Sequence, residues 1–190
     1  MGPDKKRPGN QTLRLTTYGL MTALAFVANY IRFPLLGSQI TVSNTLCVLC
    51  GMILGPGAGF LTAGIGNFLY DLIAGYGLEG IITLVSKGAI ATVTGVVCHR
   101  MLQKPQLSPR DRTRLFLGAA AVAAAYVILY MLKTLIMGLT VNGLNMDATL
   151  VKMGSKLPAS LINAVFATIA APLLMNTLHL PLHRLGILKE

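Results

Sequence analysis

Long apolar runs, separated by short polar segments, extend along nearly the whole chain. A helix needs about 20 apolar residues to cross the hydrocarbon core of a membrane, and six runs reach or approach that length. They cover residues 13–33, 40–54, 57–76, 79–99, 115–138 and 157–178. The pattern predicts an all-α membrane protein in which residues 1–190 form a single integral-membrane domain, a bundle of six transmembrane helices.

The first three runs carry local signals that refine this prediction. The first run begins like a signal peptide, because Ala23-Leu24-Ala25 mimics a cleavage site, but its apolar stretch continues to Ile31 and favours an uncleaved helix. The second run is short, and only Gly55-Pro56-Gly57 separates it from the third. This turn-forming sequence predicts either a shallow second helix or a tightly packed hairpin.

The basic residues predict how the helices are oriented. Eleven of the 16 Lys and Arg residues lie before or at the very start of the first run, between the fourth and fifth runs, or after the sixth. Cytoplasmic segments of membrane proteins carry an excess of Lys and Arg, and an even number of spans places these three segments on one side. The sequence therefore predicts cytoplasmic termini with a basic tail at 1–12, a basic cytoplasmic loop at 100–114 and an outer loop at 139–156.

Composition supports a membrane protein and argues against other classes. Hydrophobic residues make up 54% of the chain, charged residues 12%, and the mean hydropathy is +0.66. The net charge of +10 could indicate nucleic acid, but the basic residues form no patch with interleaved aromatic side chains, so no nucleic-acid partner is expected. Cys47 and Cys50 have C-x-x-C spacing inside an apolar run with no second pair, which predicts packing residues and no metal site.

Catalytic and nucleotide-binding motifs are not found in the sequence. There is no H-E-x-x-H helix, no G-x-S-x-G turn and no Walker sequence, and Phe60 stands where a dinucleotide-binding loop needs its last glycine. We therefore expect neither an enzyme nor a cofactor. Energy for any transport would have to come from an ion gradient or from a partner protein.

Several polar residues lie inside the apolar runs, where they are costly. A Lys in the middle of a transmembrane helix costs about 2.5–3.5 kcal/mol and normally faces a partner or a watery cavity. Lys87 lies within the fourth run, and Lys133 lies near the end of the fifth, where it could instead extend to the membrane surface. Asn67 and Asp71 share one helix face, and Asn163 lies within the sixth run. Together these residues predict a polar cavity that opens toward the outer side.

The arrangement resembles the substrate-binding S components of energy-coupling factor (ECF) vitamin transporters. The resemblance covers nearly the whole chain and includes the small-residue pair Gly19 and Ala23, a loop with Pro34 and Gly37, and the Gly55-Pro56-Gly57 hairpin. The most specific segments are Asp71-Leu72-Ile73-Ala74-Gly75-Tyr76 and Thr83-Leu84-Val85-Ser86-Lys87-Gly88. They are similar to the D-L-x-x-G-Y and T-F-x-x-K-G segments of the riboflavin-, pyridoxine- and hydroxymethylpyrimidine-type branch, with Leu84 in place of Phe.

The resemblance implies a binding subunit with six helices in a prokaryotic plasma membrane and a pocket near the outer surface, capped by the loop after the first helix. The implied substrate is a water-soluble vitamin or precursor, for which Tyr30, Phe33, Tyr76 and Tyr130 offer stacking surfaces. It also implies that Gly19 and Ala23 face a membrane-embedded coupling subunit that works with two ATPase subunits. The substrate-binding residues expected on this basis are Gln39, Asn67, Asp71, Tyr76, Lys87, Tyr130, Lys133 and Asn163.

Two other classes remain open at this point. An ion-coupled secondary transporter of a small polar solute would usually contain an internal repeat with corresponding broken helices, and the sequence shows none. A purely structural membrane subunit would have no need of Asp71, Lys87 and Asn163 within its helices.

Overall fold

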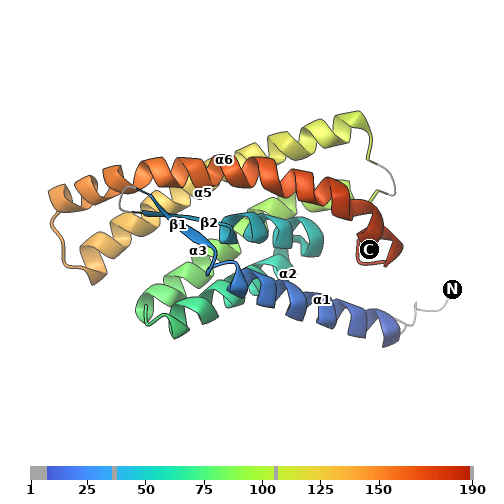
Figure 1. Ribbon diagram of the computed structural model, residues 1–190, viewed down its shortest axis with the longest axis horizontal. Coiled ribbons are helices and arrows are strands. Elements are labelled where there is room, and N and C mark those ends of the chain that lie inside the picture. Colours follow the sequence, from blue (N-terminus) through green and yellow to red (C-terminus); the bar gives the residue numbers. More distant parts are fainter. Residues whose placement is uncertain (1–7, 36–37, 105–106, 189–190) are drawn as a thin grey trace.

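The computed structural model describes residues 8–35, 38–104 and 107–188. Five long helices, α1 (Pro8–Val27), α2 (Ser43–Ile73), α3 (Leu78–Thr94), α5 (Pro109–Ile136) and α6 (Met146–Arg184), make up most of the chain (Figure 1). A π-helical turn, η1 (Gly95–His99), continues α3 into the short α4 (Arg100–Leu102), and a second, η2 (Met137–Val141), ends α5. A two-stranded hairpin, β1 (Arg32–Leu35) and β2 (Ser38–Thr41), connects α1 to α2. The mostly helical architecture agrees with the predicted fold class.

The turn predicted between the second and third apolar runs is a kink within α2. Gly55 has a φ of 77° and a ψ of −176°, a conformation that a residue with a side chain rarely adopts, and Pro56 follows it. A Cβ atom at Gly95 would lie 2.4 Å from the backbone nitrogen of Pro56, so η1 packs directly against this kink. The second and third predicted spans thus lie in one bent helix, which is why the structure has five long helices where the sequence pattern predicted six.

Helix boundaries differ from the predicted runs at several places. Asn145 caps α6, its side chain accepting a 3.0 Å hydrogen bond from the amide of Ala148, so the helix takes in much of the predicted 139–156 loop. Ser108 and Asp111 form a capping box that starts α5 inside the predicted 100–114 loop. The β1–β2 hairpin was not predicted, and it takes up the start of the run at 40–54.

The outer surface has the character expected of a membrane protein. Within the described residues, four helices are long and apolar enough to cross a membrane, namely Ser43–Ile73, Glu79–Leu102, Pro109–Thr140 and Met146–Arg184. Large apolar side chains point outward from several helices, including Leu15, Leu117, Ile128 and Val151, which are 65–74% exposed. Such a surface is suited to lipid rather than to water.

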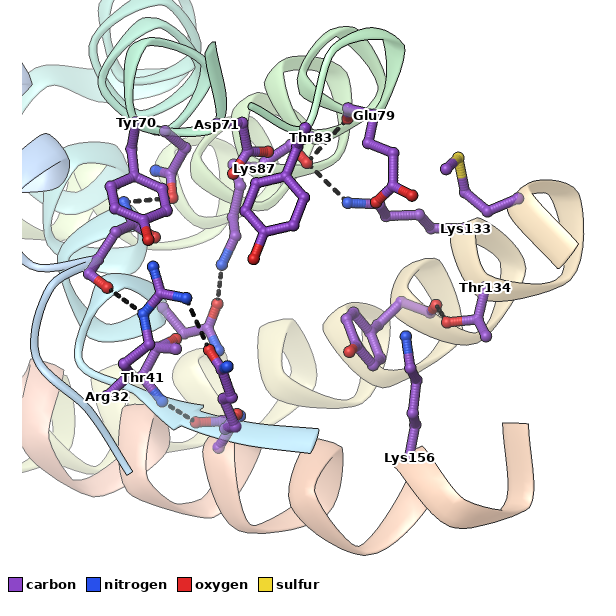
Figure 2. Close-up of a pocket in the computed structure, with 18 of the residues that line it drawn as sticks. Arg32, Thr41, Tyr70, Asp71, Glu79, Thr83, Lys87, Lys133, Thr134 and Lys156 are labelled. Carbon is purple, nitrogen blue, oxygen red and sulfur yellow. Dashed lines mark hydrogen bonds between the residues drawn. The ribbon is translucent and has the colours of Figure 1, made fainter. Parts of the chain in front are cut away.

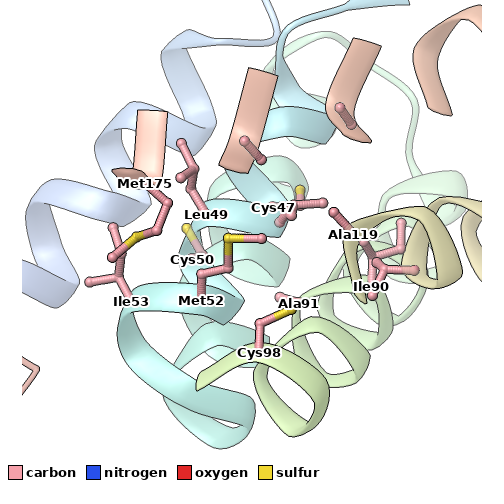
Figure 3. Packing of buried hydrophobic residues seen from close by; sticks show 14 of the residues in the cluster. Cys47, Leu49, Cys50, Met52, Ile53, Ile90, Ala91, Cys98, Ala119 and Met175 are labelled. Carbon is pink, nitrogen blue, oxygen red and sulfur yellow. The ribbon is translucent and has the colours of Figure 1, made fainter. Parts of the chain in front are cut away.

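The buried core lies where α2, α3, α5 and α6 meet (Figure 3). Cys47, Cys50 and Cys98 are free thiols inside it, in contact range of large side chains such as Met52 and Met175. Glycines allow the backbones to approach closely: a Cβ atom at Gly51 would lie 2.2 Å from the carbonyl oxygen of Ala91. The two cysteines of the C-x-x-C sequence are therefore packing residues, as predicted.

The molecule has two chemically different ends. The start of α1, the start of α5 and the end of α6 lie toward the same end (Figure 1). The described basic residues there include Arg14, Arg110, Arg112, Arg114 and Arg184. The other end is formed by the end of α2, the start of α3, the end of α5, the start of α6 and the hairpin. We call it the cavity end, because the polar cavity described below lies there.

Candidate functional site

A polar cavity of about 550 Å³ occupies the cavity end. It lies between the hairpin, the end of α2, the start of α3, the end of α5 and the start of α6, so segments far apart in the sequence contribute to it (Figure 2). All eight residues that the sequence singled out for substrate binding line this cavity, namely Gln39, Asn67, Asp71, Tyr76, Lys87, Tyr130, Lys133 and Asn163.

Lys87 extends from α3 into the cavity and is held there by an uncharged partner. Its Nζ donates a hydrogen bond to Oδ1 of Asn44 at the start of α2, and the Asn44 amide nitrogen donates to the hydroxyl of Tyr126 at 3.1 Å. The ammonium also lies 6.0 Å from the centre of the Tyr126 ring. No ion pair joins Lys87 to the nearby motif residue Asp71 in the described structure.

Lys133 also points into the bundle rather than toward the membrane surface. Its Nζ donates to Oγ1 of Thr83 at 2.6 Å, and the Thr83 hydroxyl donates to the carbonyl oxygen of Glu79 at 3.0 Å (Figure 2). The carboxylates of Asp71 and Glu79 are near enough to interact with the Lys133 charge. Lys133 therefore lines the cavity and links α5 to α3 through its hydrogen bond to Thr83.

Asn67 is nearly fully buried, and its hydrogen bonds are taken up by the protein itself. Its Oδ1 accepts from the Ser43 hydroxyl at 2.6 Å and from the Asn29 amide at 3.1 Å, while its Nδ2 donates to the carbonyl oxygen of Ala63 at 2.8 Å. This network joins the turn that follows α1 to both halves of α2. By contrast, Asp71, one turn further along α2, has no side-chain hydrogen bond within the described part of the chain and is free to contact a ligand.

The hairpin covers one side of the cavity and is fastened there by Asn163 of α6. The Asn163 side chain accepts from the amide of Thr41 and donates to the carbonyl oxygen of Gln39, both at 2.9 Å, so it pairs with β2 as a further strand would. Within the hairpin, Arg32 donates to Oε1 of Gln39 at 2.9 Å and lies 4.6 Å above the ring of Tyr70. The capping loop implied by the resemblance thus contains two paired strands held against two helices, while its Gly37 lies outside the described residues.

Aromatic rings supply the flat surfaces of the cavity. Tyr126 and Tyr130 stack with their centroids 5.8 Å apart and their planes at 28°. Of the four aromatic residues considered from the sequence, Tyr76 and Tyr130 line the cavity, whereas Tyr30 and Phe33 are outside its lining. Tyr70 and Tyr126 complete the set.

Several lining residues that were not predicted lie four positions from another lining residue on the same helix. Glu79 and Thr83 precede Lys87 at intervals of four, Tyr126 precedes Tyr130 by four, and Lys152 precedes Lys156 by four. Residues four apart share a helix face, so Lys87 and Tyr130 indicate their neighbours on α3 and α5. Lys152 and Lys156 were both outside the predicted set, and each becomes recognisable only through the other. Asn44 and Arg32 carried no such signal.

The small pair on α1 lies away from this cavity. A Cβ atom at Gly19 would meet no other atom within 4 Å, and Ala23 is exposed. By contrast, a Cβ atom at Gly66 would lie 2.6 Å from the carbonyl oxygen of Thr22 and 2.8 Å from the Cβ atom of Ala25, which is fully buried. Gly19 and Ala23 therefore do not pack inside the bundle.

Comparison with known proteins places the fold and the family. Residues 9–180 match the family described as "ECF-type riboflavin transporter, S component". A solved structure titled "Structure and mechanism of the S component of a bacterial ECF transporter" is similar at a TM-score of 0.63 and 17% identity, covering 88% of this chain and 96% of that one. A second, "Crystal structure of FolT bound with folic acid", has a TM-score of 0.45 at 19% identity, covering 85% of this chain and 97% of that one.

A search of curated sequences finds no match. The family match nevertheless spans most of the chain and agrees with the fold of the first solved structure, with the cavity at one end of the bundle and with the motif residues that line it. The chain belongs to the family of S components of ECF-type riboflavin transporters.

Proposed function

We propose that this protein is the high-affinity substrate-binding membrane subunit of an ECF-type importer. Its substrate is a water-soluble vitamin or vitamin precursor that is riboflavin-, pyridoxine- or hydroxymethylpyrimidine-like. The observation that carries the proposal is the polar cavity of about 550 Å³ at the cavity end, in which the motif residues Asp71, Tyr76 and Lys87 meet. Cavities of about 300–1,000 Å³ suit small ligands.

The lining suits a flat, hydrogen-bonding ring. The stacked Tyr126 and Tyr130 offer a surface for the face of the ring, and Lys87, Asn44 and Asp71 offer donors and acceptors for its edge. Because Lys87 is bound to a neutral amide rather than to a carboxylate, a ligand acceptor can share its ammonium without breaking an ion pair.

The membrane arrangement we propose has six spans with both termini in the cytoplasm, counting the two halves of α2 separately. The positive-inside rule supports it, because the three basic segments lie together at the end opposite the cavity. The cavity then faces the outer side of a prokaryotic plasma membrane, where a nutrient would be captured.

The exposed face around Gly19 and Ala23 is the proposed contact for a membrane-embedded coupling subunit, itself joined to two ATPase subunits. Small residues let helices approach closely within lipid, and here they face outward with open space around them. The chain itself supplies binding and no catalysis.

The proposal is tested on the purified, detergent-solubilised protein and in cells. Thermal unfolding is measured with a panel of B vitamins and their precursors, and we expect one compound to raise the midpoint strongly, because binding to the folded state stabilises it by mass action. In cells, uptake of that compound should require a co-expressed ATPase module. Uptake without the module that stops when ion gradients are collapsed would instead favour an ion-coupled secondary transporter.

A further inference from the structure

The cavity carries more positive charge than its own carboxylates can balance. Two acidic side chains line it, Asp71 and Glu79, against five cationic ones. The cationic residues are Arg32, Lys87, Lys133, Lys152 and Lys156. The lining therefore has a formal net charge of +3.

Among the described residues, no ion pair joins any of these cationic side chains to a carboxylate. Lys87 bonds to an amide oxygen, Lys133 to a hydroxyl and Arg32 to an amide oxygen and a backbone carbonyl. The ion pair found among the described residues joins Lys104 to Asp111, far from the cavity lining. Neutral partners orient these side chains without cancelling their charge.

The charge is unevenly distributed around the cavity. Asp71 and Glu79 both lie where α2 ends and α3 begins, close enough to Lys133 to offset its charge. On α6, Lys152 and Lys156 are one turn apart, and the charged residues that this helix contributes to the lining are these two. In Figure 2 the Lys156 side chain rises from α6 toward the cavity.

Lys156 also lies next to the aromatic surface. Its Nζ is 6.0 Å from the centre of the Tyr130 ring, which in turn stacks on Tyr126. A ligand ring placed on these tyrosines would bring a substituent of about one to three bonds within reach of the α6 lysines. Lysine ammonium groups bind phosphate and carboxylate oxygens through charge-assisted hydrogen bonds.

We propose that the ligand is an anion, a flat ring joined to a phosphate or carboxylate group, whose anionic group is bound by Lys152 and Lys156. This inference rests on the proposed function and narrows its substrate class. An anionic group compensates the net positive charge of the cavity lining, whereas a neutral ligand leaves it uncompensated.

The test uses matched neutral and anionic compounds with the purified full-length protein. The pairs are riboflavin and riboflavin 5′-phosphate, pyridoxine and pyridoxine 5′-phosphate, hydroxymethylpyrimidine and its phosphate ester, and nicotinamide and nicotinate. The first three pairs report on phosphate and the last on carboxylate. Dissociation constants are measured by titration calorimetry at low salt and again at about 0.5 M NaCl, where exposed charges are strongly screened.

We expect the anionic member of the pair that binds to have an affinity at least about tenfold higher, a difference that shrinks at high salt. In a Lys152→Gln, Lys156→Gln protein the preference should fall by about tenfold or more, whereas Arg112→Gln, at an exposed position of α5 outside the cavity lining, should keep it. If the double variant does not fold, each single substitution is measured instead.

The outcomes separate this inference from the proposed function. Equal or tighter binding of a neutral member, or an anion preference that survives the loss of both lysines, overturns the inference and leaves a vitamin-binding subunit intact. If the folded protein binds no member of any pair and no compound of the vitamin panel, the proposed function itself fails, and the inference falls with it.

Discussion

Lys87 shows how an ammonium group is kept between helices without a carboxylate beside it. Insertion of such a group into a membrane costs about 2.5–3.5 kcal/mol. The interactions of Lys87 with the Asn44 amide and the Tyr126 ring compensate this cost only in part. We therefore expect the ammonium group of Lys87 to bind a ligand as well. The neutral environment leaves the charge available to a ligand.

We predict that Lys87→Met weakens ligand affinity by at least about tenfold, or about 1.4 kcal/mol, while the protein remains folded, because Met keeps the length of the side chain and removes its charge. Calorimetric titration of the purified variant measures this, with Arg112→Gln as a control outside the cavity. Unchanged affinity in a folded Lys87→Met protein would make the residue structural.

The partner of Lys87 is identified by pairs of substitutions. Lys87 and Asp71 share no hydrogen bond, so the losses of ligand-binding free energy caused by Lys87→Met and by Asp71→Asn should add to within about 0.5 kcal/mol. Lys87→Met and Asn44→Ala should be clearly non-additive, because each removes the same contact. The opposite pattern would mean that Lys87 pairs with Asp71 when ligand is bound.

At the residue scale, the sequence was informative where a polar group interrupts an apolar run. Lys87, Lys133 and Asn163 were recognised for that reason, and each lies in the cavity lining. Their partners were not predictable, since Asn163 bonds to a residue 122 positions away and Lys87 to one 43 positions away. Periodicity reports on the face of one helix and carries no information on which distant side chain it meets.

At the element scale, the same limit explains the unpredicted hairpin. Its two strands are only four residues each. They are held in place by the hydrogen bonds of Asn163 on α6 and by the contact of Arg32 with the ring of Tyr70. A short, isolated hairpin is marginally stable in water, so local sequence gave little reason to expect strands. The kink in α2 was easier to predict, because Gly55 and Pro56 impose it locally.

The two faces of α1 provide a matched comparison for the proposed partner contact. We predict that Gly19→Leu leaves vitamin binding nearly intact and abolishes uptake, because the added side chain meets open space in the isolated subunit but would separate α1 from a coupling subunit. Gly66→Leu, by contrast, should lower the free energy of unfolding by about 1–3 kcal/mol and damage binding and uptake alike, because it collides with the backbone of α1.

Both variants are measured for binding after purification and for uptake in cells that express the ATPase module. Ala23→Leu, on the same exposed face as Gly19, should behave as Gly19→Leu does. Normal uptake by the Gly19→Leu and Ala23→Leu proteins would refute the contact. Parallel loss of stability and binding in Gly19→Leu would instead mean that this face packs within the bundle.

At the scale of the whole molecule, the two ends divide the tasks of the chain. The buried cysteine- and methionine-containing core fixes the helices toward one end, and the cavity with its charged lining occupies the other. Alternating helix directions make this possible, because the end of α2, the start of α3, the end of α5 and the start of α6 all reach the cavity end. Binding residues can therefore come from several helices at one end, while the remainder of each helix maintains the bundle.

The orientation of these ends in the membrane is tested by single cysteines at described, exposed positions. We predict that Met146→Cys, at the start of α6 on the cavity end, reacts with a membrane-impermeant maleimide in intact cells. Arg110→Cys, at the start of α5 on the basic end, should react only after the cells are opened. The reason is the positive-inside rule, which assigns the three basic segments to the cytoplasm.

The protein without an added cysteine is the control, because its three native thiols are buried and should stay unlabelled. Labelling is read from a gel shift, with uptake measured in parallel to show that each variant still works. Reaction of Arg110→Cys in intact cells, or protection of Met146→Cys there, would contradict the proposed orientation. A cavity that opened to the cytoplasm could not capture an external vitamin, so this result would also remove the proposed direction of transport.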